Sequence, residues 1–198
     1  YFEIPIKKGE SIIFSAGVEP VKPRSLAKMH DNEVTTRTPR SSFFNCLKNS
    51  AKQFYAKDGK DMYVISGFPW GVVLARNTFM ALPGLTLAID HRADFEAIMD
   101  TASAALQRFM VDGQTDERIA GIDLPDIPLW CVWALQQYAK SAGMQKAREK
   151  YGRLLMEIVD YILADRHPNL SIDPASGLLE TDGSRGPVSW MNSVIDGR

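Results

Sequence analysis

The spacing of hydrophobic residues divides the chain into a short first part and a longer helical part. Residues 1–6 and 11–15 are rich in aromatic and β-branched side chains and flank a polar turn, which predicts a hairpin or two strands of a sheet. Residues 17–39 carry three prolines, many charges and no sustained hydrophobic period, which suits a connection between domains. We therefore expect residues 1–31 to be the end of an N-terminal β domain with its linker. Residues 32–198 would be the first part of a helical domain.

After Pro39 hydrophobic residues recur with the period of an α-helix that has one buried face. Ser41 and Ser42 are candidate N-caps of the first such stretch, and Pro83-Gly84 follows the second. Gly113 stops the third, and a tight turn at Gly143 separates the fourth from the fifth. The predicted helices cover residues 41–57, 70–82, 92–111, 126–142 and 141–165.

The stretch at residues 126–142 differs from its neighbours because its first half has almost no polar face. A helix that is apolar all round is buried all round, whereas residues 141–165 are hydrophobic on one face only. Alternation of a buried helix with amphipathic ones, joined by short turns, indicates concentric layers. This pattern predicts a helical toroid or solenoid rather than a simple bundle.

The last stretch, residues 167–198, is rich in turn-forming residues and contains Trp190. Loops of this length in compact domains are usually functional or disordered. The aromatic side chain of Trp190 in this loop favours a functional role.

Composition narrows the kinds of partner. The 45% hydrophobic and 24% charged residues are typical of a globular protein, and the longest hydrophobic runs are too short to span a bilayer. The net charge of −1 supplies no field to attract a polyanion. We therefore expect neither a membrane nor a nucleic-acid partner, and a neutral ligand fits better.

The two cysteines, Cys46 and Cys131, lie within hydrophobic helical patterns and are expected to be reduced core thiols. Unpaired cysteines of this kind are typical of a reducing compartment, so we expect a cytoplasmic protein. The chain starts at Tyr1 without an initiator methionine and ends at Arg198 in the middle of a motif. These ends lead us to expect an excerpt of a longer protein.

The candidate chemistry is aromatic and polar rather than metallic. The three histidines lack zinc-ligand spacing, and the glycines form no phosphate-binding loop, so we expect no metal and no cofactor. Trp70 follows a proline at a turn, where its flat apolar face could stack on a sugar ring. The alternative interpretation is that Trp70 caps the core and Arg76 pairs with a carboxylate.

Three segments resemble, in order, motifs of the glycogen debranching enzyme C-terminal family, the amylo-α-1,6-glucosidases. The first, at residues 68–85, contains Phe-Pro-Trp-Gly, Ala-Arg-Asn-Thr-Phe and Ala-Leu-Pro-Gly-Leu. The second is Asp-Ile-Pro-Leu-Trp at residues 126–130. The third combines Gly-Leu-Leu at residues 177–179 with Val-Ser-Trp-Met-Asn at residues 188–192.

The resemblance implies a mainly α fold, part of an (α/α)6 toroid preceded by a short β segment from an N-terminal β domain. It also implies hydrolysis of α-1,6-linked glucose branch points of glycogen-like glucans, with inversion and without a cofactor. The partner would be an α-glucan or a maltooligosaccharide. We expect the 198 residues alone to be inactive and to self-associate through exposed hydrophobic helix faces. The implied substrate-binding residues are Trp70, Arg76, Asn77, Asp126, Trp130 and Trp190.

Two departures from the family pattern affect catalysis. Asn77 and Asn192 stand where the family usually has aspartate, and an amide can hydrogen-bond a sugar hydroxyl but cannot protonate a leaving oxygen. Asn192, Asp196 and Glu180 are therefore the candidate catalytic residues, with a proton supplied by one of the two acids. We expect the catalytic base to follow residue 198. Asp126 has a second interpretation as a helix N-cap.

Two other functions fit the same sequence. A glucan-binding homologue that has lost or reduced its hydrolysis would explain the two asparagines. A helical scaffold for protein partners would explain the layered helices alone.

Overall fold

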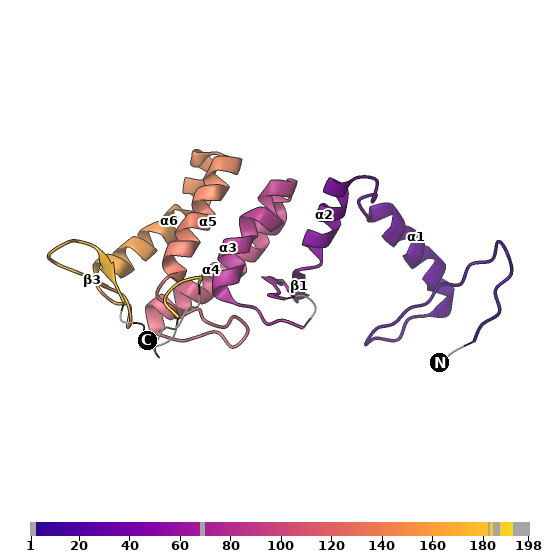
Figure 1. Ribbon diagram of the computed structural model, residues 1–198, viewed down its shortest axis with the longest axis horizontal. Helices are drawn as coiled ribbons and strands as arrows, with labels where there is room; N and C mark the ends of the chain where they lie inside the picture. The colour runs from indigo at the N-terminus through magenta and orange to yellow at the C-terminus, as the bar shows by residue number, and fades with distance from the viewer. Residues whose placement is uncertain (1–2, 68–69, 182, 184–186, 192–198) are drawn as a thin grey trace. The chain divides into compact units, whose positions relative to one another are not determined.

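The computed structural model describes residues 3–67, 70–181, 183 and 187–191 (Figure 1). The described residues are mainly α-helical, which confirms the predicted fold class at this level. The chain forms two compact units, Tyr1–Asn49 and Ser50–Arg198. No described helix combines the length and the hydrophobicity that crossing a membrane requires.

The first unit differs from the expected strands and linker. Residues 3–15 form no strand, and the predicted connection contains a 3-10 turn, η1 (Pro23–Ser25), and a helix, α1 (Leu26–Thr36). The helix α1 has no buried residue, so its sequence has no hydrophobic period from which the helix could be predicted. Good helix formers and the ion pair between Glu33 and Arg37, four positions apart, stabilise it instead.

The predicted helix at residues 41–57 was wrong in its second half. The helix α2 ends early (Phe43–Lys52), and two antiparallel strands follow, β1 (Tyr55–Asp58) and β2 (Asp61–Val64). A two-residue turn joins the strands and places Gly59 at a φ of +61°, a conformation that glycine adopts without strain. Aromatic residues that continue the helical period therefore belong to a hairpin.

The predicted helix at residues 70–82 is displaced along the chain. The helix α3 (Ala75–Leu85) begins five residues later than expected and includes Pro83 in its last turn. The hydroxyl of Tyr55 donates a hydrogen bond of 2.6 Å to the carbonyl of Leu85, and Thr86 bonds the carbonyl of Leu82. These contacts satisfy two carbonyls of the last turn, and the helix continues for two residues past Pro83.

The remaining helices confirm the predictions closely. They are α4 (Arg92–Asp112) after the 3-10 turn η2 (Leu87–Ile89), α5 (Ile127–Ala142) and α6 (Met144–Leu163). Positive φ angles at Gly113 and Gly143 end α4 and α5 where the sequence predicts. Beyond α6 the chain forms a small hairpin of β3 (Ser171–Ile172) and β4 (Leu179–Glu180).

The hydrophobic core of the second unit lies between α3, α4, α5 and α6. Phe79, Phe95 and Tyr138 are fully buried, and the rings of Phe95 and Tyr138 stack at 5.0 Å between centroids. The prediction that α5 is buried all round was wrong, because Leu129 and Trp133 are about two-fifths exposed. Their side chains line a groove between α5 and α6, which the sequence pattern alone does not distinguish from core.

Both cysteines are free thiols, as expected. Cys131, on α5, is fully buried in the hydrophobic core, and this burial raises the pKa of its thiol to about 12. Cys46 is half-buried on α2 rather than in a core. The thiol of Cys131 therefore acts as a small hydrophobic side chain.

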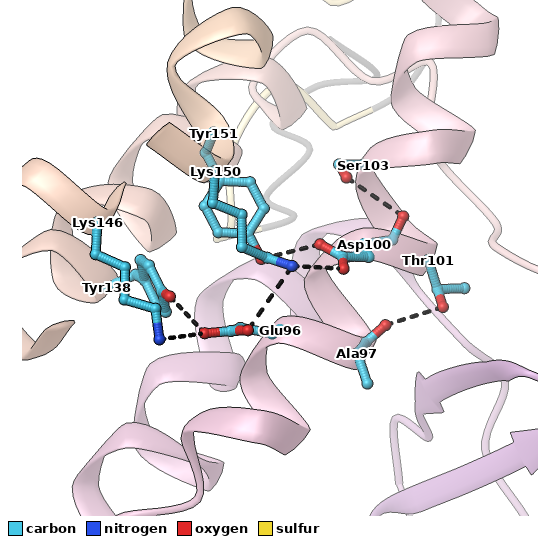
Figure 2. A network of polar contacts seen from close by, with 9 residues as sticks. All are labelled: Glu96, Ala97, Asp100, Thr101, Ser103, Tyr138, Lys146, Lys150 and Tyr151. Atoms are coloured by element: carbon cyan, nitrogen blue, oxygen red, sulfur yellow. Dashed lines mark hydrogen bonds and ion pairs between the residues drawn. The ribbon is translucent and has the colours of Figure 1, made fainter. Parts of the chain in front are cut away.

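A polar network joins α4, α5 and α6 at the edge of this core (Figure 2). The hydroxyl of Tyr138 donates to Glu96 at 2.5 Å, and Lys146 approaches the same carboxylate at 3.4 Å. Lys150 bridges Glu96 and Asp100 at 3.7 and 2.9 Å. The network fixes the three helices relative to one another.

We expect stability to fall in acid through Glu96. Burial alone would raise the pKa of Glu96, but the hydrogen bonds from Tyr138 and Lys146 and the lysine charges lower it below its ordinary value of 4.5. A carboxyl whose folded pKa is lowered stabilises the fold above the unfolded pKa, and this contribution is lost as pH falls through the folded pKa. Urea unfolding between pH 6 and pH 3 measures the slope. We expect Glu96→Gln to reduce the change of unfolding free energy with pH. The control Glu149→Gln, on the exposed face of α6, leaves that change as in the native protein. The same pH dependence in Glu96→Gln and the native protein would contradict the assignment.

Candidate functional site

A short parallel bridge brings two distant segments together at the start of α3. The amide of Ala75 donates to the carbonyl of Ala120 at 3.0 Å, and the amide of Ala120 donates to the carbonyl of Val73 at 2.9 Å. Residue 120 lies in the loop before α5, and α3 packs along α5 (Figure 1). The N-terminal ends of the two helices therefore lie side by side.

An ion pair links these two helix ends. Arg76, the second residue of α3, donates from Nε to Asp126 Oδ2 at 2.7 Å and from Nη2 to Asp126 Oδ1 at 2.8 Å. The two side chains are only 7% and 12% exposed. A bidentate arginine–carboxylate pair is among the strongest polar contacts in proteins, and a carboxylate at helix N-termini is favoured by the helix dipoles.

Two further groups attach to the pair. The indole N–H of Trp130, one turn into α5, donates to Asp126 Oδ2 at 3.0 Å. Arg76 Nη2 also donates to the main-chain carbonyl of Pro187 at 2.9 Å, which lies 111 positions later in the chain. The pair thus joins α3, α5 and the segment at residues 187–191.

The structure shows the surroundings of the three residues for which a structural alternative was left open. Arg76 does pair with a carboxylate, as the alternative interpretation held. Trp70 does not cap the core, because it is 91% exposed. Asp126 stands at the N-cap position of α5 but makes no capping hydrogen bond, since Arg76 and Trp130 occupy its oxygens.

The described structure brings some of the expected site residues together and leaves others apart. Arg76, Asp126 and Trp130 contact one another directly. Asn77 is exposed and directly follows Arg76 on α3. Trp190 is 59% exposed and lies three residues after Pro187. Glu180 is exposed on β4, and within the described residues no hydrogen bond or ion pair joins it to the cluster. The other two candidate catalytic residues, Asn192 and Asp196, lie outside the described residues.

Sequence reasoning missed one component of the cluster, the carbonyl of Pro187. A main-chain carbonyl carries no side-chain signal, so no motif could have identified it. Among the described residues no group of three or more histidine, cysteine, aspartate or glutamate side chains is arranged to hold a metal ion.

These observations define a mainly α-helical protein with a polar and aromatic cluster at the ends of two neighbouring helices. Residues 46–198 match the amylo-alpha-1,6-glucosidase family, so the chain belongs to this family of glycosidase-type proteins. The matched range contains all three motif segments and every residue of the cluster. No curated protein and no solved structure shows a significant match to the chain.

Proposed function

We propose that the protein is a glycoside hydrolase that acts on α-1,6-linked glucose branch points of glycogen-like glucans without a cofactor. The observation that carries this proposal is the contact of Arg76 with both Asp126 and Pro187 in a member of the amylo-alpha-1,6-glucosidase family. That contact gathers three motif segments, from different parts of the chain, at one end of α3 and α5.

The residues around the cluster suit a neutral sugar. Trp190, three residues after Pro187, is exposed, as is Trp70, five residues before α3, and exposed aromatic faces bind the apolar side of a pyranose ring. The exposed amide of Asn77 offers both donors and an acceptor to sugar hydroxyls. Stacking together with amide hydrogen bonds requires no charge on the ligand, which agrees with the net charge of −1.

The helices belong, in this proposal, to an (α/α)6 toroid whose substrate lies at the ends of the inner helices. The ends of α3 and α5 would then be part of the wall of the glucan site. The domain organisation stays the one expected from the sequence, with residues 1–31 before the toroid and residues 32–198 within it. The groove between α5 and α6 would be covered by another helix or by a second copy of the chain.

Hydrolysis of a glycosidic bond with inversion requires a carboxylic acid and a carboxylate about 6.5–9.5 Å apart. Asp126 is a poor candidate for either role, because Arg76 and Trp130 already occupy its oxygens. Asp196 and Glu180 are the candidate acids within the chain, but neither stands at the position of Asn192, where the resemblance implies an aspartate, so we propose that either donates the proton inefficiently and that hydrolysis is slow. The exposed aromatic and amide groups next to the cluster would orient the sugar.

Glucose release tests this proposal. The full-length protein is incubated with a glycogen phosphorylase limit dextrin, whose branches end in α-1,6-linked glucose stubs, and free glucose is measured. We expect glucose from the limit dextrin and none from linear maltohexaose, because only the first substrate has a branch point. Absence of glucose from both substrates would refute the hydrolase proposal.

A second candidate function is a glucan-binding protein with lost or reduced hydrolysis. Asn77 and Asn192 favour it, because both positions lack an acid that the resemblance leads us to expect. Calorimetric binding of maltohexaose with no release of glucose from the limit dextrin would support this function. Absence of both binding and turnover would leave a helical scaffold for protein partners.

A further inference from the structure

The ion pair between Arg76 and Asp126 is too well enclosed to be a sugar-binding group. The Arg76 residue is 6% exposed, and the Asp126 side chain is 12% exposed. A sugar hydroxyl replaces water at exposed polar atoms, whereas these charged atoms are already desolvated and paired. Breaking such a pair to bind a hydroxyl would leave a buried charge unmatched.

What the pair does hold is the main chain of a distant segment. One guanidinium nitrogen, Arg76 Nη2, bonds both Asp126 Oδ1 at 2.8 Å and the carbonyl of Pro187 at 2.9 Å. The carboxylate fixes the guanidinium plane through two hydrogen bonds, so the direction of the N–H that reaches Pro187 is fixed as well. Residues 187–191, which carry the exposed Trp190, are thereby tied to the end of α3.

Asp126 also orients a second aromatic side chain. Its Oδ2 accepts the indole N–H of Trp130 at 3.0 Å, and the Trp130 ring meets Trp133 edge-on at 5.5 Å between centroids. One largely enclosed carboxylate therefore constrains an indole on α5 and, through Arg76, the segment that bears Trp190.

We propose that Arg76 and Asp126 are positioning residues of the glucan site, which hold Trp190 and Trp130 in place without contacting the sugar. This inference rests on the proposed function for the identity of the ligand, but the restraint on residues 187–191 stands apart from it. The pair acts on binding through the aromatic groups, so its loss weakens the affinity for glucan by loosening them.

Hydrogen exchange measured by mass spectrometry tests the restraint directly. In the full-length protein we expect Asp126→Asn to raise the exchange rate of the amides at residues 188–191 at least tenfold and to weaken maltohexaose binding about tenfold. The matched control is Asp116→Asn. The Asp116 side chain is 15% exposed, and this substitution breaks its ion pair with Arg108. The control leaves exchange at residues 188–191 and glucan binding unchanged.

A second variant keeps the test decisive if Asp126→Asn does not fold. Arg76→Lys keeps the positive charge but cannot form the bidentate pair and the bond to Pro187 together, so it also speeds exchange at residues 188–191. Unchanged exchange in a folded variant of either kind overturns the inference, whatever the protein binds. If the native protein binds no maltohexaose while Asp126→Asn still speeds exchange, the glucan function fails and the restraint stands.

Discussion

Replacing Asn192 by aspartate is expected to raise the rate of glucose release from a limit dextrin by about 10²–10⁴-fold in the full-length protein. General acid catalysis contributes a factor of this size, and an amide cannot donate a proton to the leaving oxygen. The resemblance to the amylo-α-1,6-glucosidases implies an aspartate at this position. The expected gain is the largest of any single substitution in the chain.

The described structure supplies no better proton donor at the cluster. Asp126 accepts hydrogen bonds from Arg76 and Trp130, and Glu180 is exposed on β4, whereas the acid of a glycosidase is usually a buried carboxyl. Initial rates at saturating limit dextrin measure the effect, with Asn192→Gln as the control that keeps an amide. An unchanged rate in Asn192→Asp, with loss of activity in Asp196→Asn or Glu180→Gln, would show that one of those acids already donates the proton.

The sequence predicted best the elements whose hydrophobic period is long and whose ends carry glycine. The bounds of α4, α5 and α6 agree with the prediction to within three residues, because Gly113 and Gly143 adopt positive φ angles at the expected places. The hairpin of β1 and β2 was missed because Phe54 and Tyr55 continue the helical period of α2. Local pattern could not show that a two-residue turn at Gly59 reverses the chain.

The sequence selected the residues of the cluster but could not specify which of them contact one another. Motifs selected Arg76, Asp126 and Trp130, and the structure brings these three together. Arg76 lies 50 positions before Asp126 and 111 positions before Pro187. Contacts over such separations depend on how α3 packs on α5, which no local pattern specifies. Because the pair is enclosed, we propose for Arg76 and Asp126 a role in supporting the aromatic groups instead of the sugar contact that the sequence led us to expect.

The exposed Trp190 is expected to contribute most of the stacking to a bound glucan. Its exposed ring lies three residues after Pro187, whose carbonyl is held by Arg76, and can stack on a pyranose. Loss of the apolar contact and of the aromatic face together amounts to about 2 kcal/mol, which corresponds to about 30-fold in Kd. Trp133 is the matched control, because it is also partly exposed but lines the groove between α5 and α6 instead.

Isothermal titration calorimetry of the full-length protein with maltohexaose compares the two tryptophans directly. The account predicts that Trp190→Ala weakens binding about 30-fold and that Trp133→Ala leaves Kd within about twofold of the native value. The opposite pattern, with binding lost in Trp133→Ala and kept in Trp190→Ala, would place the glucan in the groove between α5 and α6 and contradict the site at the ends of α3 and α5.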